Sequence, residues 1–307
     1  MTSTLDRPVK ATTFQGVSLR RKVTNNVATV LVTLSVLIAL IPLLWVLYSV
    51  IAKGFSALTS PVWFTNSQAG GMTAFAAGGG GVYHAIIGTL LQGLVCAIIS
   101  IPIGVFVGIY LVEYGGGTRL GKLTTFMVDI LTGVPSIVAA LFIYALWVAT
   151  FGFPRSGFAV SLSLVLLMIP VIVRATEEML RIVPMDLREA SYALGVPKWK
   201  TIARIVIPTA LSGIVTGIML ALARVMGETA PLLILVGYSQ AMNFDMFDGF
   251  MGSLPGMMYD QTSAGAGANP VPTDRLWGGA ALTLILLIAL LNIGARLLAK
   301  IFAPRKV

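Results

Sequence analysis

Charge is scarce in this sequence, and so are the residues that most often bind metals or perform catalysis. Only 11% of the 307 residues are charged, against about 25% in an average soluble domain. The single cysteine, Cys96, excludes an intrachain disulfide and a cysteine-based metal site. The single histidine, His84, starts an apolar run, where it is weak evidence for catalysis. A membrane enzyme is therefore the least supported class, since no motif supplies a nucleophile with a base or a set of metal ligands.

Apolar residues dominate what remains, at 57% of the chain and a mean hydropathy of +0.91. This composition predicts an all-α integral membrane protein in the lipid bilayer. A formal charge of +9 suggests nucleic acid at first sight. The basic residues are dispersed among apolar runs, however, so the excess is better explained by membrane orientation, and no nucleic-acid partner is expected.

The apolar runs predict six transmembrane helices. The first, 27–51, is too long for the hydrophobic part of a signal peptide and is read as an uncleaved span between a basic tail, 1–26, and the rest. The remaining five form a permease core over 83–298, followed by a short tail, 299–307. Their approximate ranges are 83–112, 123–151, 157–173, 208–236 and 276–298.

The distribution of basic residues predicts the orientation. With Arg296 counted in the C-terminal tail, the tails and the loops around 113–122 and 174–204 hold 17 of the 21 Lys and Arg residues. Under the positive-inside rule these segments are cytoplasmic, so both termini are cytoplasmic as well. The Gly-containing loop 52–82 and the acidic loop 237–275 are then external. We expect a multi-pass protein of a bacterial inner or plasma membrane.

One motif in an internal loop is misleading. Gly116 to Lys122 reads GGTRLGK and fits part of a phosphate-binding P-loop, but Leu123 stands where the Mg-binding Ser or Thr belongs. The segment also joins two spans, whereas a P-loop joins a strand to a helix. We expect no cofactor in this chain, so ATP with Mg must be held by another protein if it is used. Asp245 to Gly249 does not complete a calcium loop, so no metal is expected.

Two opposite charges lie near the centre of the fifth apolar run. Arg224 and Glu228 are four residues apart in the stretch ALARVMGETAPLL. An ionisable residue near the bilayer midplane costs about 2.5–3.5 kcal/mol and by default marks an ion or substrate path. The alternative is an internal ion pair on one helix face, retained for packing alone.

Breaks and small residues mark the other spans. Gly133-Val134-Pro135-Ser136 interrupts the third span, and freed backbone groups at that depth need protein or a watery cavity around them. Thr132 and Ser136 are therefore possible pathway residues, with a simple kink as the alternative. Close helix contacts are expected where glycines are four residues apart, at 104 and 108 and at 213 and 217.

The internal loop 174–204 is the most charged part of the chain. Residues 186–194 are good helix formers, and Gly195 with Pro197 is a plausible stop. A solvated charged loop is the alternative, but the length and helical order favour docking to a partner. In the external loop 237–275, Met246, Phe247 and Phe250 are expected to form a partner surface or a re-entrant segment.

The internal loop carries a family resemblance. Its stretch EASYALGVPKWKTIARIVIP resembles the EAA loop of membrane subunits of ABC importers, with Glu189, Ala190 and Ser191 followed by Gly195 and Pro208. The resemblance implies the type I ABC importer permease fold. It also implies that the loop forms a coupling helix on a separate ATPase, through Glu189, Ala190, Ser191 and Gly195.

Three further stretches narrow the resemblance. ARVMGETAPLL, DILTGVPSIV and SLPGMMY are similar to phosphate ABC importer permeases of the PstA type. The likeness covers about residues 80–300. It implies a heterodimer with a C-type phosphate permease, two copies of an ATPase that hydrolyse ATP, and an extracytoplasmic phosphate-binding protein. It also implies that Arg224 and Glu228 take part in phosphate passage, and we count the adjacent Thr229 among the substrate-pathway residues.

The expected function is thus a non-enzymatic permease subunit of an ATP-driven phosphate importer. Arg224 can offer a guanidinium fork to two phosphate oxygens. Glu228 can balance Arg224 when the path is empty and accept the proton of hydrogen phosphate, which sulfate lacks. The alternatives are the same machinery carrying sulfate or molybdate, and a secondary anion transporter without an ATPase.

Overall fold

The computed structural model describes residues 18–68, 80–264 and 273–302. Predictions about the rest of the N-terminal tail, most of the Gly-rich loop 70–81 and the last five residues lie outside this part. The chain divides into two units, Met1–Ser49 and Val50–Val307. The first unit includes most of helix α1 (Leu19–Leu58), whose apolar side chains are exposed.

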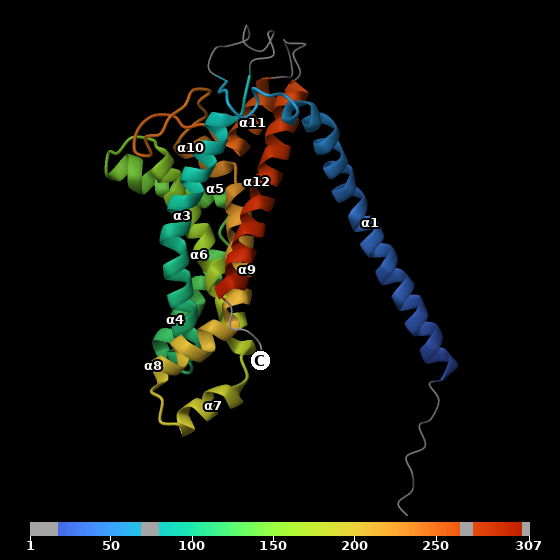
Figure 1. Cartoon of the computed structure of the whole chain (residues 1–307), viewed down its shortest axis with the longest axis vertical. Helices are drawn as coiled ribbons and strands as arrows, with labels where there is room; N and C mark the ends of the chain where they lie inside the picture. Colours follow the sequence, from blue (N-terminus) through green and yellow to red (C-terminus); the bar gives the residue numbers. More distant parts are fainter. Residues whose placement is uncertain (1–17, 69–79, 265–272, 303–307) are drawn as a thin grey trace, which may run out of the picture. The chain divides into compact units, whose positions relative to one another are not determined.

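All regular elements in the described part are helical (Figure 1). Within the described ranges, five helices are long and apolar enough to cross a membrane, and a bent pair is the sixth when its two halves are counted as one span. The five are α1, α3 (Tyr83–Ile109), α6 (Gly157–Ile182), α9 (Ile207–Met226) with its preceding turns, and α12 (Thr273–Phe302). The prediction of an all-α membrane protein with six spans is confirmed.

The third span is the bent pair. Helix α4 (Arg119–Thr132) and helix α5 (Ser136–Ile143), extended by a π-helical turn at Tyr144–Thr150, meet at an angle of 105°. Pro135 lies at the break and immediately precedes α5. Proline cannot donate a backbone hydrogen bond to the preceding turn, which explains why the span does not continue as one straight helix.

Helix α6 lies at the centre of the second unit, between α3 and α9. Glycines on α3 and α9 allow these two helices to approach α6 closely. A Cβ atom added to Gly108 of α3 would lie 2.7 Å from Thr176 Cβ, and one added to Gly217 of α9 would lie 2.4 Å from Ala175 Cβ. Such distances are too short for any side chain, so only glycine permits these approaches. Gly104 and Gly213 make equally close contacts with α6. The predicted close helix contacts at both glycine pairs are confirmed.

The internal loop is shorter than expected. Helix α6 continues past Arg174 to Ile182, so the charged residues at 174–181 are helical and form ion pairs along or beside the helix. The loop proper holds α7 (Met185–Ala193) and α8 (Lys198–Thr201), which leads through the π-helical turn Ile202–Val206 into α9. In Figure 1, α7 and α8 lie together at one end of this unit.

The external segments fold onto the opposite end. Helix α10 (Ala230–Leu235) follows α9, and α11 (Leu254–Ala264) packs against α12. Trp63, from the first external loop, is fully buried, and its indole nitrogen donates to Thr283 Oγ1 at 3.1 Å. The Tyr238 hydroxyl donates to Gln68 Oε1, so it accepts the hydrogen bond from His84 Nε2, at 2.9 Å. His84 is therefore a buried structural residue.

Candidate functional site: a broken helix with an unpaired arginine

The fifth span breaks at the predicted charged pair. Helix α9 ends at Met226, Gly227 caps it, and α10 begins at Ala230. Pro231 is in the first turn of α10, where its missing N–H is tolerated. Its ring would clash with the carbonyl of residue 227 in a continuous helix, which explains why the helix stops.

This break overturns one expectation about Arg224 and Glu228. Because Glu228 lies beyond the end of α9, the two residues do not share a helix face. Within the described ranges, neither residue forms an ion pair within 4.0 Å or a hydrogen bond through its side chain. Arg224 is exposed and Glu228 is half-buried. The proposed balancing of Arg224 by Glu228 is thus wrong for this conformation.

Glu228 lines a small pocket whose walls are mostly apolar. The water-accessible volume is ≈ 10 Å³, about the space that one water molecule needs. Gln92 and Thr89 of α3 and Ser253 before α11 contribute the other polar side chains. Gln92 was not among the predicted residues, since a glutamine in an apolar run has no distinctive signal. Its exposed fraction is only 3%.

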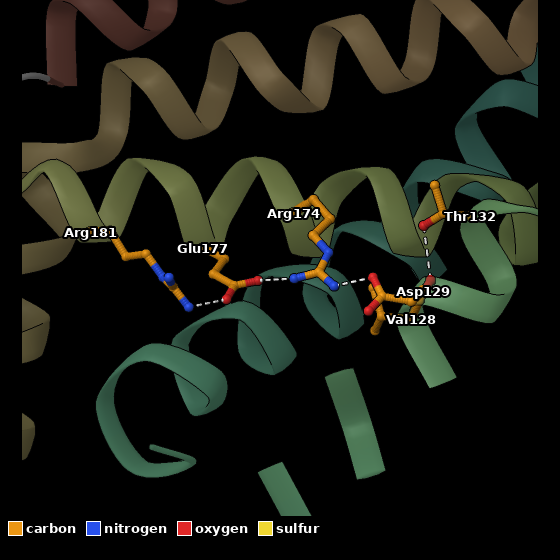
Figure 2. Close-up of polar contacts among 6 residues, drawn as sticks. All are labelled: Val128, Asp129, Thr132, Arg174, Glu177 and Arg181. Atoms are coloured by element: carbon orange, nitrogen blue, oxygen red, sulfur yellow. Dashed lines mark hydrogen bonds and ion pairs between the residues drawn. The ribbon is translucent and has the colours of Figure 1, made fainter. Parts of the chain in front are cut away.

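The other predicted pathway residues lie apart from this pocket. Thr132 donates to Val128 O at 2.8 Å within α4, so its hydroxyl is satisfied by its own helix (Figure 2). Ser136 opens α5, which packs against α10. Thr229 lies in the break between α9 and α10. None of these three residues is among those that line the Glu228 pocket.

A second charged group, on α4 and α6, is fully compensated. Figure 2 shows Arg174 of α6 between Asp129 of α4 and Glu177 of α6, with Arg181 on the far side of Glu177. The Arg174–Glu177 distance is 2.7 Å and the Arg181–Glu177 distance is 2.5 Å. Two cations and two carboxylates make this chain of ion pairs neutral. Sequence reasoning missed the group because Asp129 and Arg174 are 45 residues apart.

A helix, α7, forms in the internal loop where the sequence predicts one. Helix α7 ends at Ala193, and Gly195 has a φ of +73°, a left-handed conformation that favours glycine. Glu189 and Ala190 are exposed on this helix. Ser191 is not: its exposed fraction is 4%, and its hydroxyl bonds to Thr201 at 2.8 Å. Ser191 therefore holds the loop together and does not face outward.

Large apolar side chains project from the same loop. The exposed fraction is 83% for Leu194, 66% for Trp199 and 62% for Met185. Exposed large apolar side chains commonly mark a protein interaction site when they form a contiguous patch. We call Met185, Leu194 and Trp199, together with the exposed Glu189, the candidate docking surface.

Comparison with known proteins identifies the family. Residues 100–307 match the family of binding-protein-dependent transport system inner membrane components. The chain is 57% identical over 292 residues to the phosphate transport system permease protein PstA of Mycobacterium leprae, covering 94% of this chain and 93% of that protein. The chain belongs to the PstA permeases. This permease is also 54% identical to PstA 1 of Mycobacterium tuberculosis (strain CDC 1551 / Oshkosh), over 98% of this chain and 97% of that one.

The fold of the permease has a solved counterpart. A bacterial ABC transporter involved in the import of the acidic polysaccharide alginate matches with a TM-score of 0.60 and 13% identity, over 92% of this chain and 98% of that chain. At this identity the likeness concerns the fold alone. The predicted type I ABC importer architecture and the multi-pass membrane location are confirmed.

Proposed function

We propose that this chain is the A-type membrane subunit of an ATP-driven phosphate importer. The observation that carries the proposal is the 57% identity to a phosphate permease over 94% of the chain. ATP with Mg is bound and hydrolysed by two copies of a separate ATPase, and phosphate is delivered by an extracytoplasmic binding protein. A C-type phosphate permease completes the pathway.

Arg224 supports this proposal physically. Its guanidinium is exposed in a span and no carboxylate of the described part neutralises it. Contact with lipid would cost about 2.5–3.5 kcal/mol, so a second subunit or a watery path must cover this side chain. An unpaired guanidinium there can donate two parallel hydrogen bonds to a phosphate. Arg224 is thus the anion-binding residue of the pathway.

Glu228 does not neutralise Arg224 from the same helix face, and we assign it a different role in the pathway. It borders a pocket with Gln92 and Ser253, close to the break that follows Arg224. A carboxylate near the bound anion repels fully ionised sulfate, whereas hydrogen phosphate can donate a hydrogen bond from its P–OH group to that carboxylate. Glu228 thereby contributes to selectivity and prevents Arg224 from becoming a deep trap. Thr229, in the same break, and Ser136, on α5, border the route.

The internal loop supports the ATPase partner. Helix α7 and the turn at Gly195 present an apolar surface beside the exposed carboxylate of Glu189. Apolar anchors with a polar rim are typical of stable protein interfaces. Glu189 then meets a basic group of the ATPase, and Ala190 allows close contact.

The test is uptake of radiolabelled phosphate by vesicles that contain the complete complex, with ATP and Mg on the ATPase side. Phosphate uptake that requires ATP and resists excess sulfate is the expected result. Competition by sulfate or molybdate would point to a general oxyanion importer. Uptake that persists without an ATPase would instead indicate a secondary transporter and would contradict the proposal.

A further inference from the structure

Glu113 accepts hydrogen bonds from both short helices of the internal loop, α7 and α8. It lies in the π-helical turn Tyr110–Tyr114, which continues α3 on the internal side. Arg188 of α7 donates to Glu113 Oε1, and Lys198 at the start of α8 donates to the Glu113 backbone carbonyl. One residue outside the loop therefore holds the two short helices that flank Gly195.

Neighbouring contacts make this attachment specific. The second guanidinium nitrogen of Arg188 donates to Leu180 O at 2.8 Å, at the end of α6. The ammonium of Lys198 lies 4.7 Å from the centre of the Tyr114 ring. Arg188 thus joins α7 to the internal ends of both α3 and α6. We call Glu113, Arg188 and Lys198 the internal clamp.

Burial distinguishes the clamp from an ordinary surface ion pair. The exposed fractions are 8% for Glu113 and 7% for Arg188. A buried charge that loses its partner is strongly unfavourable, whereas replacement of both charges by apolar groups is often tolerated. Such pairs add little net stability but enforce one geometry, and here that geometry orients α7 relative to α3.

We propose that Glu113 is a positioning residue that transmits movement of the coupling helix to the transmembrane helices. The inference rests on the proposed docking of the ATPase to α7. When the ATPase moves α7, Arg188 pulls on Glu113 and hence on α3. Because Gly108 of α3 contacts Thr176 of α6 directly, α3 and α6 move together. Without the clamp, α7 tilts on the ATPase while the spans stay still.

The test measures ATP hydrolysis and phosphate uptake by the complete complex in vesicles. Glu113→Gln keeps the size of the side chain and removes its charge. The expected result is an assembled complex that hydrolyses ATP but transports about tenfold less phosphate per ATP. Glu178→Gln is the matched control, because Glu178 is exposed on α6 and forms no ion pair in the described part. It should leave the ratio unchanged.

A second variant covers the case in which Glu113→Gln fails to assemble. Glu113→Gln combined with Arg188→Met removes both buried charges, so assembly should return while the ratio of phosphate to ATP stays low. A normal ratio in Glu113→Gln or in the double variant would overturn the proposal. A normal ratio would overturn only the role of Glu113. The proposed function would still stand if Gly195→Asp uncouples ATP hydrolysis from phosphate uptake in the same assay. If the wild-type complex takes up no phosphate, the proposed function itself fails.

Discussion

Arg174 of α6 forms an ion pair with Asp129 of α4, whereas Arg224 of α9 has no carboxylate partner in the described part of the chain. Both arginines belong to membrane-spanning helices. The first is neutralised within a chain of four charges, which fits a structural role (Figure 2). The second retains an uncompensated charge that can attract an anion. Because the two arginines differ in their partners, we propose a structural role for Arg174 and an anion-binding role for Arg224.

Glu177 should matter more for stability than Asp129. It pairs with both Arg174 and Arg181, and its side chain is only 8% exposed, against 59% for Asp129. Glu177→Gln leaves two cations with one carboxylate, so we expect a lower melting temperature of the detergent-purified complex. Asp129→Asn leaves Arg174 paired with Glu177 and should change the melting temperature little. Equal effects of the two variants would refute this ranking.

The approach of α9 to α6 should depend on the size of one side chain. Gly217→Ala places a methyl group 2.4 Å from Ala175 Cβ and forces the helices apart. Overpacking of this kind costs about 1–3 kcal/mol, so the complex should denature at lower temperature. Adding Ala175→Gly removes the clash and should recover much of the loss. Gly294→Ala is the control, since nothing lies within 4 Å of the added atom.

Gly195 should be needed both for its backbone conformation and for its position on the docking surface. Its φ of +73° makes any side chain strained, at about 1–2 kcal/mol. A Cβ atom added at Gly195 has no neighbour within 4 Å in this chain, so a larger residue causes no steric clash there. Gly195→Asp should therefore preserve the spans but weaken copurification of the ATPase and abolish coupled uptake. Gly195→Ala should have a milder effect. Full uptake with Gly195→Asp would contradict docking at this surface.

Glu228→Gln should reduce both the rate and the selectivity of transport. The amide keeps the shape of the side chain in the pocket with Gln92, but it has no negative charge to repel sulfate, and it accepts only a weaker hydrogen bond from the P–OH group of hydrogen phosphate. We expect lower phosphate uptake and a measurable competition by sulfate. Competition assays on wild type and variant would show this. Unaltered uptake and selectivity would remove Glu228 from the mechanism.

Features set by local sequence were predictable. Apolar runs and the bias of Lys and Arg predicted the spans, and the helix formers before Gly195 predicted α7. The glycines of α3 and α9 predicted close contacts, because a missing side chain limits helix separation directly. The glycine spacing did not indicate which helix the glycines would contact, which is α6.

Contacts between distant segments were not predictable. Glu113 and Arg188 are 75 residues apart. No sequence motif around either residue indicates that the two are in contact. The separation of Arg224 from Glu228 was missed for a different reason. A spacing of four residues assumes a continuous helix, and Pro231 prevents one by acting on the preceding turn. Pro231 instead lies in the first turn of a new helix, α10.

The most direct test of the account is phosphate uptake by the complete complex carrying Arg224→Gln, with ATP supplied and assembly verified. Loss of one hydrogen bond to a charged group costs about 1.5–3 kcal/mol, so uptake should fall by at least about tenfold. Arg296→Gln, which removes an exposed arginine of α12, should transport normally. Normal uptake with Arg224→Gln would contradict the account and leave Arg224 with a structural role only.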